Sequence, residues 1–276
     1  MRMANEKRIS SPRWSEVAIK SAAGRLIAQY ELLVGRDHIL KNGLHFDDVY
    51  EKLIYSRFGV ELYEDDDLGS DTDGQKVLGR YDVRANTAYL DQVVSRESGD
   101  PRRAFTCWHE VAGHGVLQGA WLRKRLDTSG IVAIDVTEKS MSADTERAIE
   151  RQANVFASHV AAPDWLINYA VNTTFRPNRR FIFKEPCIYC LDVHGLPLKK
   201  YIVDAGDLCG WIGSKISGFF GGLSAEALGY RLSELGWVRD LSTPDLHLHR
   251  SLKSKSALSG RFSKQLTCEW LMRATA

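Results

Sequence analysis

Apolar residues in the first third of the chain recur at the spacing of an amphipathic helix and then change to the alternation of a strand. The helical spacing predicts helices over residues 14–34 and 46–58. Alternation over 60–63 predicts a short strand, and the pattern of 77–90 predicts a hairpin that turns at 84–86. The chain therefore begins with two helices and continues into a small sheet.

The remainder of the chain is mainly helical in pattern. Apolar spacing predicts helices over 100–122, 146–159, 212–219 and 225–235, with a strand-like piece at 131–134. Many helices beside one small sheet predict an α+β fold.

Composition is that of a globular protein and argues against several classes. Of 276 residues, 44% are hydrophobic and 26% are charged, which is typical of a domain with a buried core. The net charge of +2 gives no strong indication of a nucleic-acid or membrane partner. No apolar run is long enough to span a bilayer, and none at the start resembles a signal peptide. Five cysteines, an odd number, are not a disulfide framework, so we expect a reduced, cytoplasmic protein.

His109-Glu110 begins the strongest chemical signal in the sequence. In the common H-E-x-x-H motif, two histidines one helical turn apart bind Zn²⁺, and the glutamate between them is the general base. Here the second histidine, His114, comes one residue later than in that motif. A regular α-helix would turn the two side chains about 140° apart, too far to share an ion. We therefore predict a π-type bulge at Ala112-Gly113, where glycine permits the wider turn that returns His114 to His109.

Glu150 is the candidate third ligand. Ala153, Asn154 and Ala157 share its helix face, and small residues there let this helix approach the histidine helix closely. Three protein ligands that leave one position open are typical of catalytic zinc. The alternative is a solvated helix on which the histidines and Glu110 hold no ion.

Several segments of the chain together resemble the ImmA/IrrE family of metallopeptidases. The most specific is Glu-x-x-Ala-Asn-x-Phe-Ala at 150–157, which follows the His-Glu element. The resemblance covers roughly residues 15–165 and 213–240. The matching segments are 59–62, 89–91, 103–110, 150–157 with Pro163, and 223–236.

The resemblance implies a zincin-like metallopeptidase core with a small C-terminal helical segment. It implies that His109, His114 and Glu150 bind Zn²⁺ and that Glu110 is the general base. Enzymes of this family cleave a helix-turn-helix transcriptional repressor and so release its genes in response to stress. We therefore expect a zinc-dependent endopeptidase that acts on such a repressor and regulates transcription.

The chain departs from the family in its motif, because the family normally has H-E-x-x-H. The longer H-E-x-x-G-H spacing also occurs in the dipeptidyl peptidase III family, so it can support zinc catalysis. The alternative is a non-catalytic regulatory or DNA-associated module that retains the metallopeptidase fold and has lost efficient chemistry.

The chain divides into four parts by comparison with the family pattern. Residues 1–165 form the expected zincin-like domain, and 166–212, which departs from the family, are expected to be an insertion. Residues 213–240 form the helical segment expected to close the core. Residues 241–276 are rich in serine, lysine, arginine and histidine, so we expect a basic, mobile tail.

A cysteine pair in the expected insertion suggests a second metal site. Cys187 and Cys190, with His194 and Cys209, meet the ligand count of structural zinc. No second Cys-x-x-Cys follows, so ordinary buried thiols are the alternative.

A basic segment with interleaved aromatic residues lies in the same region. Its residues are Arg176, Arg179, Arg180 and Lys184, with Phe175, Phe181 and Phe183 between them. This segment and the basic tail could contact DNA weakly, although a solvated basic strand is the simpler interpretation.

Overall fold

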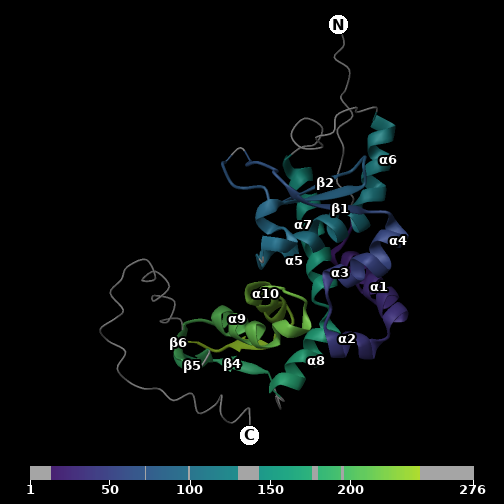
Figure 1. The fold of residues 1–276 in the computed structure, drawn as a ribbon. Helices are drawn as coiled ribbons and strands as arrows, with labels where there is room; N and C mark the ends of the chain where they lie inside the picture. The colour runs from purple at the N-terminus through teal and green to yellow at the C-terminus, as the bar shows by residue number, and fades with distance from the viewer. Residues whose placement is uncertain are drawn as a thin grey trace. The chain divides into compact units, whose positions relative to one another are not determined.

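The computed structural model describes most of the chain and divides it into two compact units (Figure 1). The described residues are 14–71, 73–98, 100–129, 143–175, 180–193 and 196–242. The first unit contains the residues up to Pro163 together with Gly218–Leu223. The second unit contains Asp164–Ser217 and the residues from Ser224 onward.

Helices make up most of the first unit. The helices before the sheet are α1 (Glu16–Val34), α2 (Arg36–Asn42), α3 (Phe46–Val49), the π-helical η1 (Tyr50–Ile54) and α4 (Tyr55–Phe58). Those after the sheet are η2 (Gln92–Val94), η3 (Arg96–Ser98), α5 (Arg102–Cys107), η4 (Trp108–Gln118), α6 (Gly119–Ser129) and α7 (Ala143–Ala161). The predicted helices over 14–34, 46–58, 100–122 and 146–159 are therefore confirmed, the second and third as runs of consecutive helical elements.

The sheet of the first unit has three strands in the order β1-β3-β2. They are β1 (Glu61–Asp66), β2 (Gly79–Asp82) and β3 (Thr87–Asp91). β1 pairs in parallel with β3, and β2 pairs antiparallel with β3, which confirms the predicted strand and hairpin. The hairpin turn contains Asn86, whose φ of 58° lies in the left-handed region that asparagine tolerates. Ala88 and Leu90 of β3 are fully buried on one face of the sheet.

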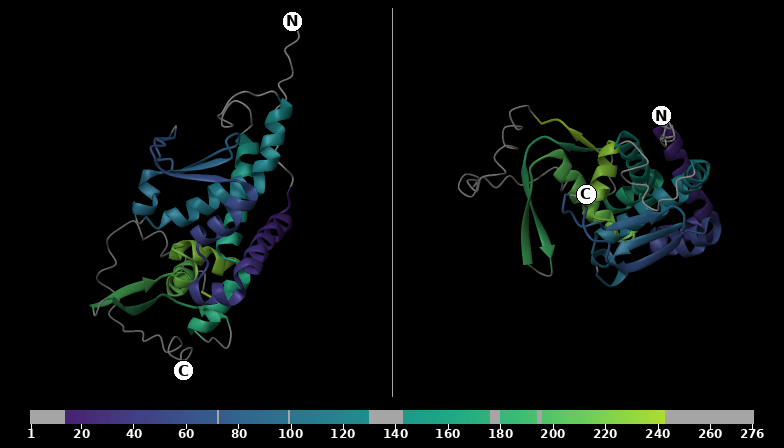
Figure 2. Two further views of the ribbon diagram at one scale, coloured as in Figure 1. Left: turned by 45° about the vertical axis from the view of Figure 1, so that its right-hand side comes forward. Right: turned by 90° about the horizontal axis from the view of Figure 1, so that it is seen from above.

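A continuous helical run packs against the buried face of the sheet. α5, η4 and α6 follow one another without a break, and η4 contacts both β2 and β3. η4 also packs against α7, and α7 packs against α1. The first unit is therefore layered, with the π-helix between the sheet and the α-helices (Figures 1 and 2). Val60, Ala112 and Ala153 are fully buried in this core.

The second unit combines helices with two separate pairs of strands. Its helices are α8 (Asp164–Phe175), α9 (Ala205–Ile216) and α10 (Ala225–Glu234), with the short η5 (Ser217–Phe219) spanning the division between units. Its strands are β4 (Phe181–Phe183), β5 (Cys187–Val193), β6 (Leu196–Ile202) and β7 (Val238–Asp240). β4 pairs in parallel with β7, and β5 pairs antiparallel with β6.

The helix boundaries of the second unit follow from side-chain caps. Ser224 caps α10 by accepting a hydrogen bond from the backbone of Ala227, which confirms the helix predicted over 225–235. The helix predicted from 212 begins at Ala205 instead, because Asp204 caps it there.

The segment predicted as an insertion, 166–212, lies entirely in this second unit. The segment predicted to close the core, 213–240, also lies there, except for Gly218–Leu223. The strand-like piece predicted at 131–134 and nearly all of the tail at 241–276 lie outside the described residues. No helix in the described ranges is both long and apolar enough to cross a membrane.

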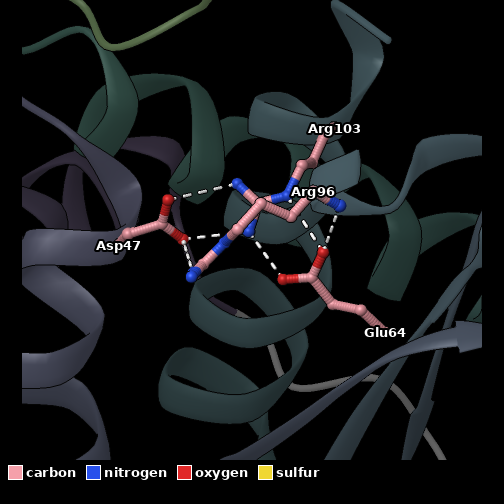
Figure 3. A network of polar contacts seen from close by, with 4 residues as sticks. All are labelled: Asp47, Glu64, Arg96 and Arg103. Carbon is pink, nitrogen blue, oxygen red and sulfur yellow. Dashed lines mark hydrogen bonds and ion pairs between the residues drawn. The ribbon is translucent and has the colours of Figure 1, made fainter. Parts of the chain in front are cut away.

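A network of four charged residues holds α5 to two other elements (Figure 3). Arg103 on α5 contacts Glu64 on β1 at 2.6 Å and Asp47 on α3 at 2.9 Å. Arg96 contacts the same Asp47 at 3.0 Å. The two arginines differ in burial, since the side chain of Arg103 is 14% exposed and that of Arg96 is 63% exposed. Arg103 is therefore the less exposed of the two cations, and its side chain contacts both carboxylates.

Arg103→Ala is expected to lower the free energy of unfolding by about 2–3 kcal/mol, because it leaves two neighbouring carboxylates without their partly buried cation. Arg96→Ala is the matched control and is expected to cost at most about 1 kcal/mol, as exposed ion pairs do. Urea denaturation followed by circular dichroism measures both. Equal losses in the two variants would contradict the central role of Arg103.

Candidate metal centre

The helix that carries both histidines is wound as a π-helix. η4 runs over 11 residues, so the predicted π-type turn is confirmed and extends well beyond Ala112 and Gly113. A π-helix closes i→i+5 hydrogen bonds, so residues five apart lie on the same side. His109 and His114 therefore face each other, with their Nε2 atoms 3.0 Å apart and their ring planes at 83°.

Two glycines let η4 approach its neighbours closely. A Cβ on Gly113 would lie 2.9 Å from both the Cβ and the carbonyl oxygen of Ala153 in α7. A Cβ on Gly115 would lie 3.0 Å from both methyl groups of Val60. Backbone rather than side chain therefore forms the surface of η4 where it meets α7 and the edge of the sheet. This close approach brings α7, with Glu150, up to the histidine pair.

Glu150 completes a group of three ligand atoms. Its Oε2 lies 3.1 Å from Nε2 of His109, and its Oε1 lies 3.3 Å from Nε2 of His114. The three ligand atoms lie within 4.8 Å of one another, and they could hold a metal ion. The side chain of Glu150 is 49% exposed, whereas those of His109 and His114 are 14% and 11% exposed. Solvent therefore reaches the group from the side of the carboxylate.

Opposite charges shift the pKa values within this group. Burial lowers the pKa of His114, but the hydrogen bond with Glu150 and the charges of Glu110 and Glu150 outweigh burial and raise it to about 9. Burial raises the pKa of Glu150, but hydrogen bonds with both histidines outweigh burial and hold it well below its usual range. The surroundings of the group therefore favour the protonated form of His114 and the ionised form of Glu150.

Glu110 lies beside the ligand group and is not part of it. Its Oε1 is 3.9 Å from Nε2 of His109. Strand β2 covers the carboxyl group, since a Cβ on Gly79 would lie 2.9 Å from the same oxygen. Burial raises the pKa of Glu110, and the nearby charge of His114 opposes this only in part. A buried carboxyl group with a raised pKa beside a ligand group has the properties of a general base.

Aromatic rings and a buried amide surround the histidines. Tyr81 of β2 stacks on the ring of His114 with an interplanar angle of 13°, and its hydroxyl group donates to Asn86 at 2.6 Å. Phe105 lies beside the ring of His109 at 6.4 Å. Tyr81 and Gln118, which hydrogen-bonds with His114, are not among the site residues predicted from the sequence. Gln118 could have been found from the sequence, because it is a polar residue four positions after His114 in a segment of mostly small and apolar residues.

The second metal site stays a prediction. Cys187 and Cys190 lie on β5, where the structure describes the backbone only, and His194 lies outside the described residues. Cys209 lies in α9 as a free, buried thiol.

The aromatic residues of the basic segment are not available to stack with bases. Phe175, Phe181 and Phe183 are all buried, and the first two rings pack against each other. Arg180 lies over the ring of Trp237 at 4.4 Å and donates to the carbonyl oxygen of residue 235. Arg176 and Arg179 lie outside the described residues.

A scan of the chain against protein-family models finds no match, and a search of curated proteins finds none either. The ImmA/IrrE assignment therefore depends on the motif resemblance and stays a prediction.

Gly113→Ala is expected to push α7 away from η4, because the new methyl group would overlap the backbone and Cβ of Ala153. We expect a loss of about 1–3 kcal/mol in unfolding free energy and weaker Zn²⁺ binding, since Glu150 moves with α7. Gly24→Ala on α1 is the control: its Cβ meets nothing within 4 Å, so the helix should gain up to about 1 kcal/mol. Thermal unfolding and Zn²⁺ titration check both, and unchanged binding in Gly113→Ala would contradict the packing argument.

Binding of Zn²⁺ at pH 7.5 is expected to release about one proton, because a ligand histidine must be neutral and His114 has a pKa of about 9. For the same reason apparent affinity should rise with pH, by up to about tenfold per unit, and level off near pH 9. Calorimetric titration in buffers with different ionisation enthalpies counts the protons. Binding without proton release at pH 7.5 would show that His114 is already neutral.

Proposed function

We propose that the chain is a zinc-dependent endopeptidase with a zincin-like core, of the ImmA/IrrE type. The observation that carries the proposal is the meeting of His109, His114 and Glu150 on two elements, with Glu110 directly beside them. The resemblance named the same four residues, and the π-helix accounts for their unusual spacing.

The donor set supports zinc as the ion. Two imidazole nitrogens and one carboxylate oxygen are a common ligand set of catalytic zinc, and three protein ligands leave a position open for reactants. The half-exposed Glu150 marks the side on which the group is accessible. Zn²⁺ held there would supply Lewis-acid polarisation of a peptide carbonyl and of water.

Glu110 supplies the proton transfer in this proposal. Its buried carboxylate accepts a proton from the attacking water and then passes it to the nitrogen of the leaving amine. Its raised pKa brings its basicity closer to neutral pH, where a general base is most effective. Gly79 covers the carboxyl group of Glu110 and keeps it out of bulk water. A larger residue at position 79 would overlap the side chain of Glu110.

The proposed substrate is a helix-turn-helix repressor, which the family resemblance suggests and which would link proteolysis to transcription in a stress response in the cytoplasm. The alternative of a non-catalytic module arose from the lengthened motif. The π-helix argues against that alternative, because it brings the ligand atoms together in spite of the extra residue.

Glu110→Gln is expected to retain Zn²⁺ and to lower the rate of repressor cleavage by at least about 10²-fold. The substrate is a co-expressed helix-turn-helix repressor whose gene lies next to the gene of this protein. Glu150→Ala should lose the metal ion as well as the cleavage. Metal content by mass spectrometry and repressor fragments on gels measure the two effects separately. Cleavage unchanged in Glu110→Gln, or wild-type protein without zinc, would overturn the proposal.

A further inference from the structure

Gln118 is a fully buried polar residue at the end of η4, and both ends of its amide are engaged. Its Nε2 donates to the carbonyl oxygen of Ile149 at 2.8 Å. Its Oε1 lies 2.9 Å from Nδ1 of His114. The amide therefore joins a ligand of the metal centre to the backbone of α7.

The hydrogen bond to Ile149 determines which nitrogen of His114 carries a hydrogen. A backbone carbonyl only accepts, so the NH₂ group of Gln118 must face Ile149 and its oxygen must face His114. That oxygen also only accepts, so Nδ1 of His114 must carry a hydrogen. In the neutral ring Nε2 is then left with its lone pair, and Nε2 is the atom that faces His109 and Glu150.

The same amide connects two of the three ligands. Ile149 directly precedes Glu150, so the carbonyl group that orients Gln118 belongs to the turn of α7 that carries the carboxylate. His109 has no such anchor, since its Nδ1 is buried without a hydrogen-bond partner in the described part of the structure. Only one of the two histidine ligands is thus held in a single tautomer by the described residues.

We infer that Gln118 is a positioning residue of the metal centre, which fixes Nε2 of His114 as the ligand atom and holds His114 in register with Glu150. This inference rests on the proposed metal-binding function. Gln118 contacts His114 at Nδ1, on the edge of the ring away from the ligand group, so it acts through the histidine. Outer residues of this kind typically affect metal affinity by 10–100-fold, and an amide replaces the more usual carboxylate or backbone carbonyl.

The test compares the Gln118→Met variant with the wild-type protein and uses Zn²⁺ alone as the probe. Methionine has a volume similar to that of glutamine, and its side chain makes no comparable hydrogen bonds. We expect affinity to fall by about 10–100-fold and the ¹⁵N spectrum of zinc-loaded His114 to lose its single Nδ1-protonated form. Gln118→Glu keeps an acceptor for Nδ1, so it should keep that tautomer and lose less affinity. Gln152, on α7, is a second buried glutamine, so Gln152→Met controls for the loss of a buried amide. This control should leave the Zn²⁺ affinity and the tautomer of His114 unchanged.

The outcomes separate this inference from the proposed function. If the wild-type protein binds no Zn²⁺, the proposed function fails and the inference fails with it. If the wild-type protein binds Zn²⁺ and Gln118→Met keeps both its affinity and the tautomer of His114, the inference alone is overturned. If Gln118→Met lowers the free energy of unfolding and leaves the tautomer of His114 unchanged, the amide of Gln118 has only a structural role and the inference is likewise overturned. If Gln118→Met does not fold, the tautomer in Gln118→Glu decides, and its loss would count against the inference.

Discussion

The candidate metal centre depends on the winding of one stretch of helix. With α-helical winding, His114 would point about 140° away from His109, and no ion could contact both. With π winding, the two Nε2 atoms lie 3.0 Å apart. Long π-helices are rare, and this one is held between two layers that contact its backbone directly at Gly113 and Gly115. The same close packing brings α7 near enough for Glu150 to reach the histidines.

The fold gives the two carboxylates of the centre opposite properties. Glu150 is half-exposed, and its hydrogen bonds with two histidines lower its pKa and favour its ionised form. Glu110 is buried under β2, and burial raises its pKa towards the range of a general base. Pairs of titratable groups whose surroundings separate their pKa values are typical of acid–base sites. The difference arises from position alone, since both residues are glutamates.

The supports of the centre lie on either side of the ligands along the helical run. Before the ligands, Arg103 holds α5 to α3 and β1 through Asp47 and Glu64 (Figure 3). After them, Gln118 holds the end of η4 to α7. The π-helical segment is therefore held to neighbouring elements on both sides of the histidines. The ion network and the buried amide thus both contact the helical run that carries the candidate metal centre.

The sequence by itself predicted that His109, His114 and Glu150 come together. It also predicted the need for a π-type turn, because a spacing of five residues is incompatible with a shared ion on an α-helix. It also determined most helices and the hairpin, because periodicity reports contacts between near neighbours in the chain. Only the tertiary structure showed the hydrogen bond of Gln118 to Ile149, which is 31 residues away. It likewise decided the strand pairing after Pro163, where β4 pairs with β7 across a long separation, because pairing between distant segments leaves no local pattern.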